Sequence, residues 1–246
     1  MKYILIGTYL WTGGTFLLYT DRYKRKVSNK GRGVVAIGRP REFDVDKALD
    51  QALQVFWLKG YEGASLSDLT EAMGITRPSL YAAFGNKEAL FRKAVDRYQG
   101  WAKDASYRAL NAPTSREVVE QMMRLAADWH TDPCHPRGCM IMQGTLACGS
   151  DAEAFREEMV SRCAEGVTAM QERFEQAKSE GDLPGDADPA ALARYVTTVL
   201  SGMAVAAAGG ATRADLYQTI EIALRAWPVN DTAKPNRVAR ATKRRA

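Results

Sequence analysis

Two short helices joined by a tight turn, between Ser65 and Leu90, constrain the fold of this chain more than any other feature of its sequence. Ser65 followed by Asp68 has the spacing of a capping box, in which each side chain satisfies a backbone amide that the start of a helix leaves unpaired. Gly74 can adopt the left-handed conformation that ends such a helix. Thr76 suits the N-cap of a second helix. The segment therefore predicts a helix-turn-helix.

The second of these helices is expected to have an apolar face and a polar face. Leu80 and Phe84 are expected in the core, and Pro78 is tolerated because first-turn amides have no partner within the helix to lose. Asn86 caps a longer helix that begins at once. A preceding apolar stripe that ends at Gly60 supplies a third helix, so the segment predicts a small three-helix core. The residues left on the exposed face of the second helix are Thr76, Arg77, Ser79 and Tyr81.

Residues 43–91 resemble the DNA-binding domain of the TetR/AcrR family of bacterial transcriptional regulators. The resemblance rests on the segment GYEGASLSDLTEAMGITRPSLYAAFGNKEALF, on the preceding GRPREFD, and on the spacing of Tyr81, Phe84 and Lys87. It implies an all-α protein with an N-terminal helix-turn-helix DNA-binding domain of three helices, residues 39–100. A helical-bundle domain for ligand binding and dimerisation, residues 101–227, is expected to follow. The family consists of regulators rather than enzymes, and no cofactor is expected.

The resemblance also implies roles for individual residues. The second helix of the motif would enter the major groove of double-stranded DNA, where Arg77 suits a bidentate bond to guanine and Ser79 suits a base edge or a phosphate. Lys87 begins a helix whose N-terminal amides also attract phosphate. Arg39 and Arg41 form a short basic arm of the kind that enters a minor groove, although a solubilising leader has the same composition. The expected DNA contacts are Arg39, Arg41, Ser65, Thr76, Arg77, Pro78, Ser79, Tyr81 and Lys87.

The net charge of the chain does not mark the DNA-binding surface. The 246 residues carry a formal charge of +5, but residues 1–43 contribute +7 and residues 228–246 contribute +5, so the body between them is −7. Acids also slightly outnumber bases within residues 44–100. The DNA-binding prediction therefore depends on the placement of a few groups. Residues 228–246 have no apolar period, which predicts a disordered basic tail.

The body after residue 100 is expected to consist of amphipathic helices. Asp188 followed by Pro189 marks a helix start, and many small residues in the apolar run that follows permit close helix approach. In proteins that this chain resembles, the last two long helices pair with their copies in a second subunit. We therefore expect a homodimer through residues 189–227, although burial within one subunit is an alternative. Two recognition helices, roughly 34 Å apart or a little more, would then read an inverted repeat.

Methionines are concentrated in the body of the chain, and methionine adapts its shape to irregular apolar ligands. A ligand would lower operator affinity if it bound better to a conformation that does not fit the DNA. Together with the family resemblance, this predicts a cytoplasmic repressor that a small-molecule effector releases from its operator. The candidate pocket residues are Trp101, Met122, Leu125, Trp129, Met142, Met170 and Phe174.

All four cysteines and both histidines lie in the segment from His130 to Cys163. One interpretation is a thiol-redox or metal-responsive regulator, because Cys and His suit Zn or Cu(I). The other is that the cysteines are small apolar residues, because their spacing matches no standard zinc pattern. Catalysis by a cysteine is not expected, because no oxyanion-hole signature accompanies it. The candidate metal ligands are His130, Cys134, His135 and Cys139.

The leader, residues 1–38, differs in composition from the rest of the chain. Residues 3–19 are apolar enough to resemble a signal or short membrane segment, and a basic stretch follows, as in a membrane-tethered regulator. Their length and composition are marginal for a span. We prefer an overextended translation start or a disordered leader, because proteins that this chain resembles begin just before GRPRE. A start codon at Val34 or Val35 would account for the difference.

Overall fold

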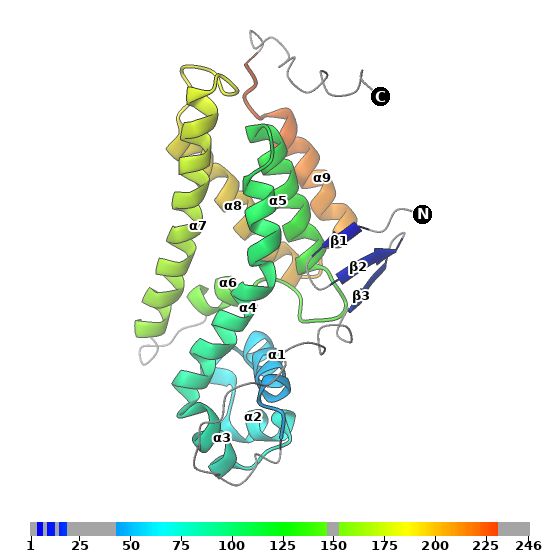
Figure 1. The fold of residues 1–246 in the computed structure, drawn as a ribbon, viewed down its shortest axis with the longest axis vertical. Helices are drawn as coiled ribbons and strands as arrows, with labels where there is room; N and C mark the ends of the chain where they lie inside the picture. Colours follow the sequence, from blue (N-terminus) through cyan, green and yellow to red (C-terminus); the bar gives the residue numbers. More distant parts are fainter. Residues whose placement is uncertain (1–3, 7–8, 13–14, 19–42, 147–152, 231–246) are drawn as a thin grey trace, which may run out of the picture. The chain divides into compact units, whose positions relative to one another are not determined.

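The computed structural model describes residues 4–6, 9–12, 15–18, 43–146 and 153–230 (Figure 1). These residues fall into two compact units, the first within residues 1–53 and 65–105 and the second within residues 54–64 and 106–246. The sequence predicts that the boundary between the DNA-binding domain and the second domain lies at residue 100. The division differs from this because α1 (Val45–Gly63) and α4 (Lys87–Leu110) each contribute residues to both units.

Three short strands, β1 (Ile4–Ile6), β2 (Tyr9–Thr12) and β3 (Thr15–Leu18), precede the helices. They pair in order as an antiparallel sheet, with Ile4 opposite Trp11 and Thr12 opposite Thr15. This sheet was not predicted from the sequence, because residues 3–19 were expected to be irregular or to span a membrane. The segment is rich in the aromatic and β-branched residues that favour strands. The remaining leader residues and the tail 231–246 lie outside the described residues.

The helix-turn-helix of the first unit consists of α2 (Leu66–Met73) and α3 (Arg77–Phe84). α2 begins at the predicted capping box: Ser65 Oγ accepts a hydrogen bond from the Asp68 amide (3.0 Å), and the Asp68 carboxylate accepts one from the Ser65 amide (3.0 Å). Arg97 on α4 donates to both carboxylate oxygens of Asp50 on α1 (2.9 and 3.2 Å), which joins these two helices. The buried side chains of α2 and α3 are Leu69, Met73, Leu80 and Phe84.

Gly74 ends α2 in the left-handed conformation, with φ 64° and ψ 32°. A Cβ at this position would meet nothing within 4 Å, so the cost of Gly74→Ala is backbone strain alone. We expect this substitution to lower the free energy of unfolding by about 1–2 kcal/mol. Gly74→Asn should cost less, because asparagine visits this conformation more readily. Urea unfolding of the three proteins checks the order, and equal stability of the glycine and alanine forms would contradict it.

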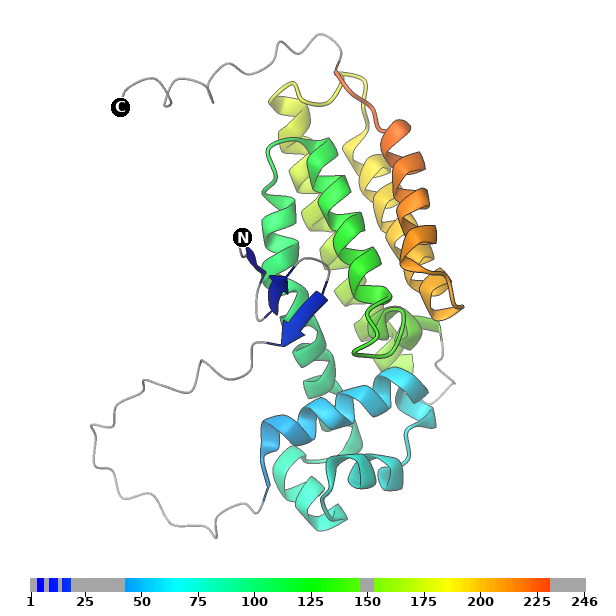
Figure 2. The same ribbon diagram turned by 90° about the vertical axis from the view of Figure 1, so that its right-hand side faces the viewer.

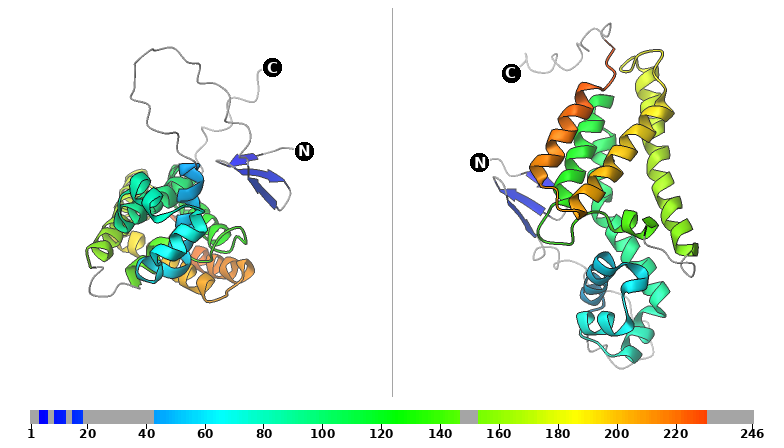
Figure 3. Two further views of the ribbon diagram at one scale, coloured as in Figure 1. Left: turned by 90° about the horizontal axis from the view of Figure 1, so that it is seen from below. Right: turned by 180° about the vertical axis from the view of Figure 1, so that it is seen from behind.

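The second unit is a bundle of α5 (Ser115–His130), α7 (Glu153–Ser179), α8 (Pro189–Ala208) and α9 (Arg213–Arg225), with the short α6 (Met140–Leu146) against α7. α5 packs on both α8 and α9, which lie side by side in Figure 2. α7 packs along α8 (Figure 3). α8 begins at the predicted cap, where Asp188 Oδ1 accepts from the amides of Ala190 (3.0 Å) and Ala191 (3.1 Å).

Aromatic and polar contacts link α5, α7 and the residues after α9 in this bundle. Phe174 and Trp227 are buried with their ring centroids 5.1 Å apart. Trp227 Nε1 donates to the buried hydroxyl of Ser115 (3.3 Å). Arg173 donates to the carbonyls of Leu110 (3.0 Å) and Ala112 (2.8 Å), so its guanidinium satisfies carbonyls at and just beyond the C-terminus of α4.

Among the described residues, α8 is the one helix whose length and composition would allow it to cross a membrane. Ala193, Val196 and Met203 on this helix are buried in the bundle core. The core helix of a globular domain has the same composition, so this property of α8 is weak evidence for a span.

Candidate nucleic-acid interface

The start of α3 gathers the residues that the sequence predicts as DNA contacts. Thr76 is the N-cap: its Oγ1 accepts from the Ser79 amide (3.4 Å) and lies 3.0 Å from the Ser79 hydroxyl. Pro78 lies in the first turn, where it displaces no intrahelical hydrogen bond. Arg77 and Pro78 are exposed, and Ser79 is half-buried. The structure places all of them, with Tyr81, on one helix and its cap.

Arg77 is the first residue of α3, and its guanidinium is held by a neutral group. Its Nη2 donates to the hydroxyl of Ser67 on α2 (2.8 Å). Within the described part of the chain, Arg77 forms no ion pair with a carboxylate, so the protein leaves its charge uncompensated. Ser67 was not among the contacts predicted from the sequence. No local sequence pattern distinguishes Ser67, because the bond joins two helices across ten residues of the chain.

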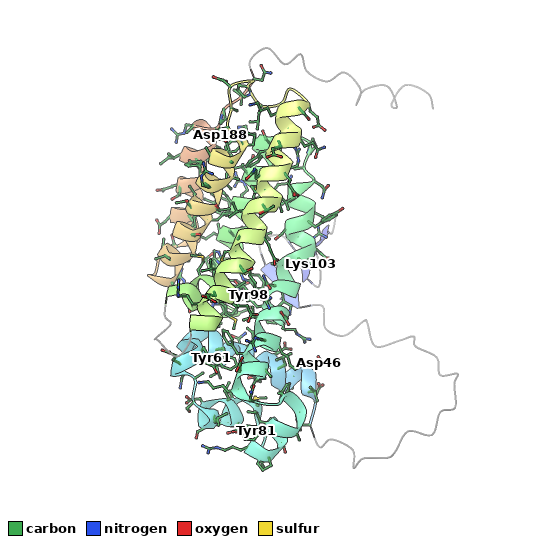
Figure 4. All side chains as sticks on the ribbon, turned by 90° about the vertical axis from the view of Figure 1, so that its left-hand side faces the viewer. Asp46, Tyr61, Tyr81, Tyr98, Lys103 and Asp188 are labelled. Atoms are coloured by element: carbon green, nitrogen blue, oxygen red, sulfur yellow. The ribbon has the colours of Figure 1, made fainter. Side chains whose placement is uncertain are left out.

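Tyr81 and Lys87 follow along the chain. Tyr81 is on α3 with 49% of its surface exposed (Figure 4). Lys87 is the first residue of α4, next to Asn86, whose Oδ1 accepts from the Ala89 amide (2.7 Å). The positive end of the α4 dipole and the lysine charge both attract an anion at this point. A phenol, an ammonium group and a helix N-terminus are all groups that can bind the phosphate backbone.

The three other predicted DNA contacts, Ser65, Arg39 and Arg41, are not on α3 or at the start of α4. The Ser65 hydroxyl is engaged in the capping box and lies 2.8 Å from the Asp68 carboxylate, so the start of α2 accounts for this serine without DNA. Arg39 and Arg41, the predicted minor-groove arm, lie outside the described residues.

The candidate effector residues do not share one environment. Met170 and Phe174 are fully buried in the bundle core, which is a packing role. Met142 is half-buried on α6, with its sulfur 3.6 Å from the Ser201 hydroxyl of α8. Trp101 belongs to the first unit and is 37% exposed. The half-buried residues Met122, Leu125 and Trp129 are together on α5.

The two histidines lie at the end of α5 and in the loop that follows it. His130 is buried, and its Nδ1 donates a hydrogen bond to the Gly138 carbonyl (3.1 Å). The Gly138 amide donates to the His130 carbonyl (3.1 Å). Burial is the main cause that lowers the pKa of His130 to about 4. The hydrogen bond to Gly138 raises this pKa, and the charge of nearby His135 lowers it further. The His135 ring stacks on Trp57 and contacts Trp129, with centroids 4.6 and 4.4 Å apart.

The three described cysteines, Cys134, Cys139 and Cys163, are free thiols. The hydrogen bond and negative charge of Asp132 raise the pKa of Cys134, while burial and then nearby Cys139 raise the pKa of Cys163. A raised pKa lowers the thiolate fraction of Cys134 and Cys163 at neutral pH, which weakens the thiol-redox alternative for these two residues. The described residues contain no group of three or more His, Cys, Asp or Glu arranged to hold a metal ion. Cys148 lies outside them.

α2 and α3 form a capped helix pair, and α3 has an exposed polar face. These features define a helix-turn-helix DNA-binding protein. Residues 48–94 match the family model for bacterial regulatory proteins of the tetR family, and residues 116–227 match the model for the tetracyclin repressor-like C-terminal domain. The chain belongs to the TetR family of transcriptional regulators. The family resemblance and the helix-turn-helix fold predicted from the sequence are confirmed.

Individual relatives agree with this assignment. The HTH-type transcriptional repressor ComR of Escherichia coli (strain K12) is 34% identical over 193 residues, which cover 78% of this chain and 92% of that protein. A cysteine mutant of CifR, a TetR family transcriptional regulator solved in complex with 26-bp operator DNA, is 43% identical with a TM-score of 0.75, over 78% of this chain and all of that one. A putative TetR regulator from Rhodococcus sp. RHA1 is 38% identical with a TM-score of 0.53, over 74% and 98%.

Lys87→Ala should weaken binding to all DNA sequences to a similar degree, because a phosphate contact carries no base information. Each lost contact should lower the slope of log K against log salt by about 1 for every half-site occupied. Binding isotherms on the operator and on unrelated DNA, at several salt concentrations, check this. A selective loss on the operator with an unchanged salt slope would contradict the phosphate assignment.

Proposed function

We propose that this protein is a homodimeric cytoplasmic repressor that binds an inverted-repeat operator and leaves it when a small molecule binds to the second unit. The observation that carries the proposal is α3, on which an uncompensated arginine, a serine hydroxyl and an exposed tyrosine lie together. Arg77 and Ser79 are proposed to contact bases, and Thr76, Tyr81 and Lys87 to contact phosphates. ComR is named a repressor, and CifR was solved on operator DNA; both support the proposal.

A second copy of the chain is proposed to pack on α8 and α9. Val205 on α8 and Ile222 on α9 are 52% and 65% exposed, and residues 195–208 contain no charged side chain. An apolar helix of this kind is ordinarily buried, so its exposed side supports a twofold contact through residues 189–227. The twofold axis would present two copies of α3 to successive major grooves.

The effector is proposed to bind in the second unit, beside the half-buried residues of α5 and α6. Met122, Trp129 and Met142 retain partial exposure, and thioether side chains can re-pack around an irregular apolar molecule. Release from DNA would require the effector to bind more tightly to a conformation that fits the operator poorly. The burial of Met170 and Phe174 in the core makes them weaker candidates for direct contact.

Two measurements on the full chain test this function. Sedimentation equilibrium should give twice the mass of the chain at the concentrations at which it binds DNA. A gel shift with DNA that flanks its own gene should be reversed by apolar small molecules fractionated from an extract of the cell that makes the protein. A monomer that binds the operator with full affinity would overturn the dimer, and a shift that no fraction reverses would overturn effector release.

A further inference from the structure

The hydrogen bond between Arg77 and Ser67 links the two helices of the helix-turn-helix at the surface. Arg77 begins α3, Ser67 is in the first turn of α2, and both side chains are exposed. The donor is Nη2 of Arg77 and the acceptor is the Ser67 hydroxyl, 2.8 Å apart. Burial of Leu69, Met73 and Leu80, rather than this exposed bond, holds α2 and α3 together.

The chemistry of the acceptor distinguishes Arg77 from other arginines of the first unit. Arg92 pairs with Glu88 (Nη1 to Oε1 2.5 Å), and Arg97 pairs with Asp50 and Asp46, so carboxylates offset the charge of both. The Ser67 hydroxyl is neutral and takes one of the five N–H donors of a guanidinium. The hydroxyl therefore restricts the direction of the Arg77 side chain without offsetting its charge, and it leaves enough donors for a bidentate bond.

We propose that Ser67 is a positioning residue that holds the Arg77 guanidinium in the orientation in which it reads a base. A free, exposed arginine samples many rotamers and loses that freedom when it binds a base edge. Restriction before binding reduces this loss, which is the general benefit of preorganisation. The inference rests on the proposed function of Arg77 as a base-reading residue.

The test measures base discrimination by the full chain rather than affinity alone. Binding isotherms are recorded at one salt concentration for the operator and for the same operator with the base pair read by Arg77 changed in both half-sites. Ser67→Ala removes the acceptor, and Ser67→Thr keeps the hydroxyl as the matched control. Arg77→Ala and the double variant Ser67→Ala/Arg77→Ala complete a cycle. The base pair is the one at which Arg77→Ala loses discrimination.

We expect Ser67→Ala to reduce discrimination by about threefold to tenfold per half-site, which is the size of effect that one lost hydrogen bond produces. Ser67→Thr should retain most of the discrimination. In the Arg77→Ala background, Ser67→Ala should change nothing further. The melting temperature of Ser67→Ala should equal that of the wild type, because the bond is exposed and the helices pack through other residues.

Three results would overturn the inference, and they are distinguishable. If Arg77→Ala retains discrimination at every operator base pair, the base-reading role fails and the positioning role fails with it. If Arg77→Ala loses discrimination but Ser67→Ala keeps it, Arg77 reads a base without help from Ser67, and only the further inference is wrong. If Ser67→Ala weakens both DNAs equally, with or without Arg77, then Ser67 contacts the DNA itself.

Discussion

Arg77→Ala is expected to weaken binding to the natural operator by about 30-fold to 10⁴-fold, because a bidentate arginine–guanine contact is worth about 1–3 kcal/mol and a dimer makes it twice. The exposed position of Arg77 at the start of α3 and its uncompensated charge are the structural grounds for this expectation. Binding to an operator altered at the base pair that Arg77 reads should change much less. The variant should thus lose preference at one position in each half-site.

Fluorescence anisotropy with labelled operator DNA at a fixed salt concentration measures this loss. Arg116→Ala is the matched control, because it removes the same charge from α5, where Arg116 lies near Glu120 (3.7 Å). That control should bind within about twofold of the wild type, because α5 is not part of the helix-turn-helix and an exposed ion pair contributes little to stability. Equal losses for the two variants would show that total charge, rather than a base contact, explains the effect of Arg77.

Acidification from pH 7 to pH 5 is expected to destabilise the folded protein by about 2 kcal/mol through His130 alone. Burial lowers the pKa of this histidine from 6.5 to about 4. Between these two values the unfolded chain binds a proton that the folded chain excludes. The contribution of neutral His130 to stability is therefore fully present above pH 6.5 and falls as the pH drops through this window. About 3 kcal/mol of it is lost once His130 is protonated in both states.

Urea unfolding at pH 7 and pH 5, at one protein concentration, measures this dependence. His130→Asn is the matched variant, because its side-chain amide can still donate to the Gly138 carbonyl but does not titrate. The difference in stability between the two pH values should shrink by about 2 kcal/mol in this variant. An unchanged difference would assign the acid sensitivity to other groups.

Local features of the chain were predictable because they depend on neighbouring residues. The caps at Ser65, Thr76 and Asp188 and the left-handed Gly74 occur as expected, since each uses hydrogen bonds within a few residues of sequence. The amphipathic spacing of α3 separated its buried residues from its exposed ones for the same reason. The exposed face of α3 could therefore be predicted from the sequence.

Features that depend on distant residues could not be assigned in this way. The bond from Arg77 to Ser67 crosses between two helices, and its acceptor is one of several serines in the segment. Met170 and Phe174 have the same helical spacing as pocket residues would have, and only their packing in the core that includes Trp227 shows their role. Tertiary contacts likewise decide which residues of α1 and α4 belong to each of the two units.

Hydroxyl-radical footprinting of the wild-type chain on DNA that flanks its own gene tests most directly whether a dimer reads its operator through α3. We predict two protected segments related by a twofold axis, with their centres roughly 34 Å or a little more apart along the duplex. Arg77→Ala at the same concentration should leave both segments unprotected. Protection of one unrepeated segment, or a wild-type footprint from Arg77→Ala, would contradict this mode of binding.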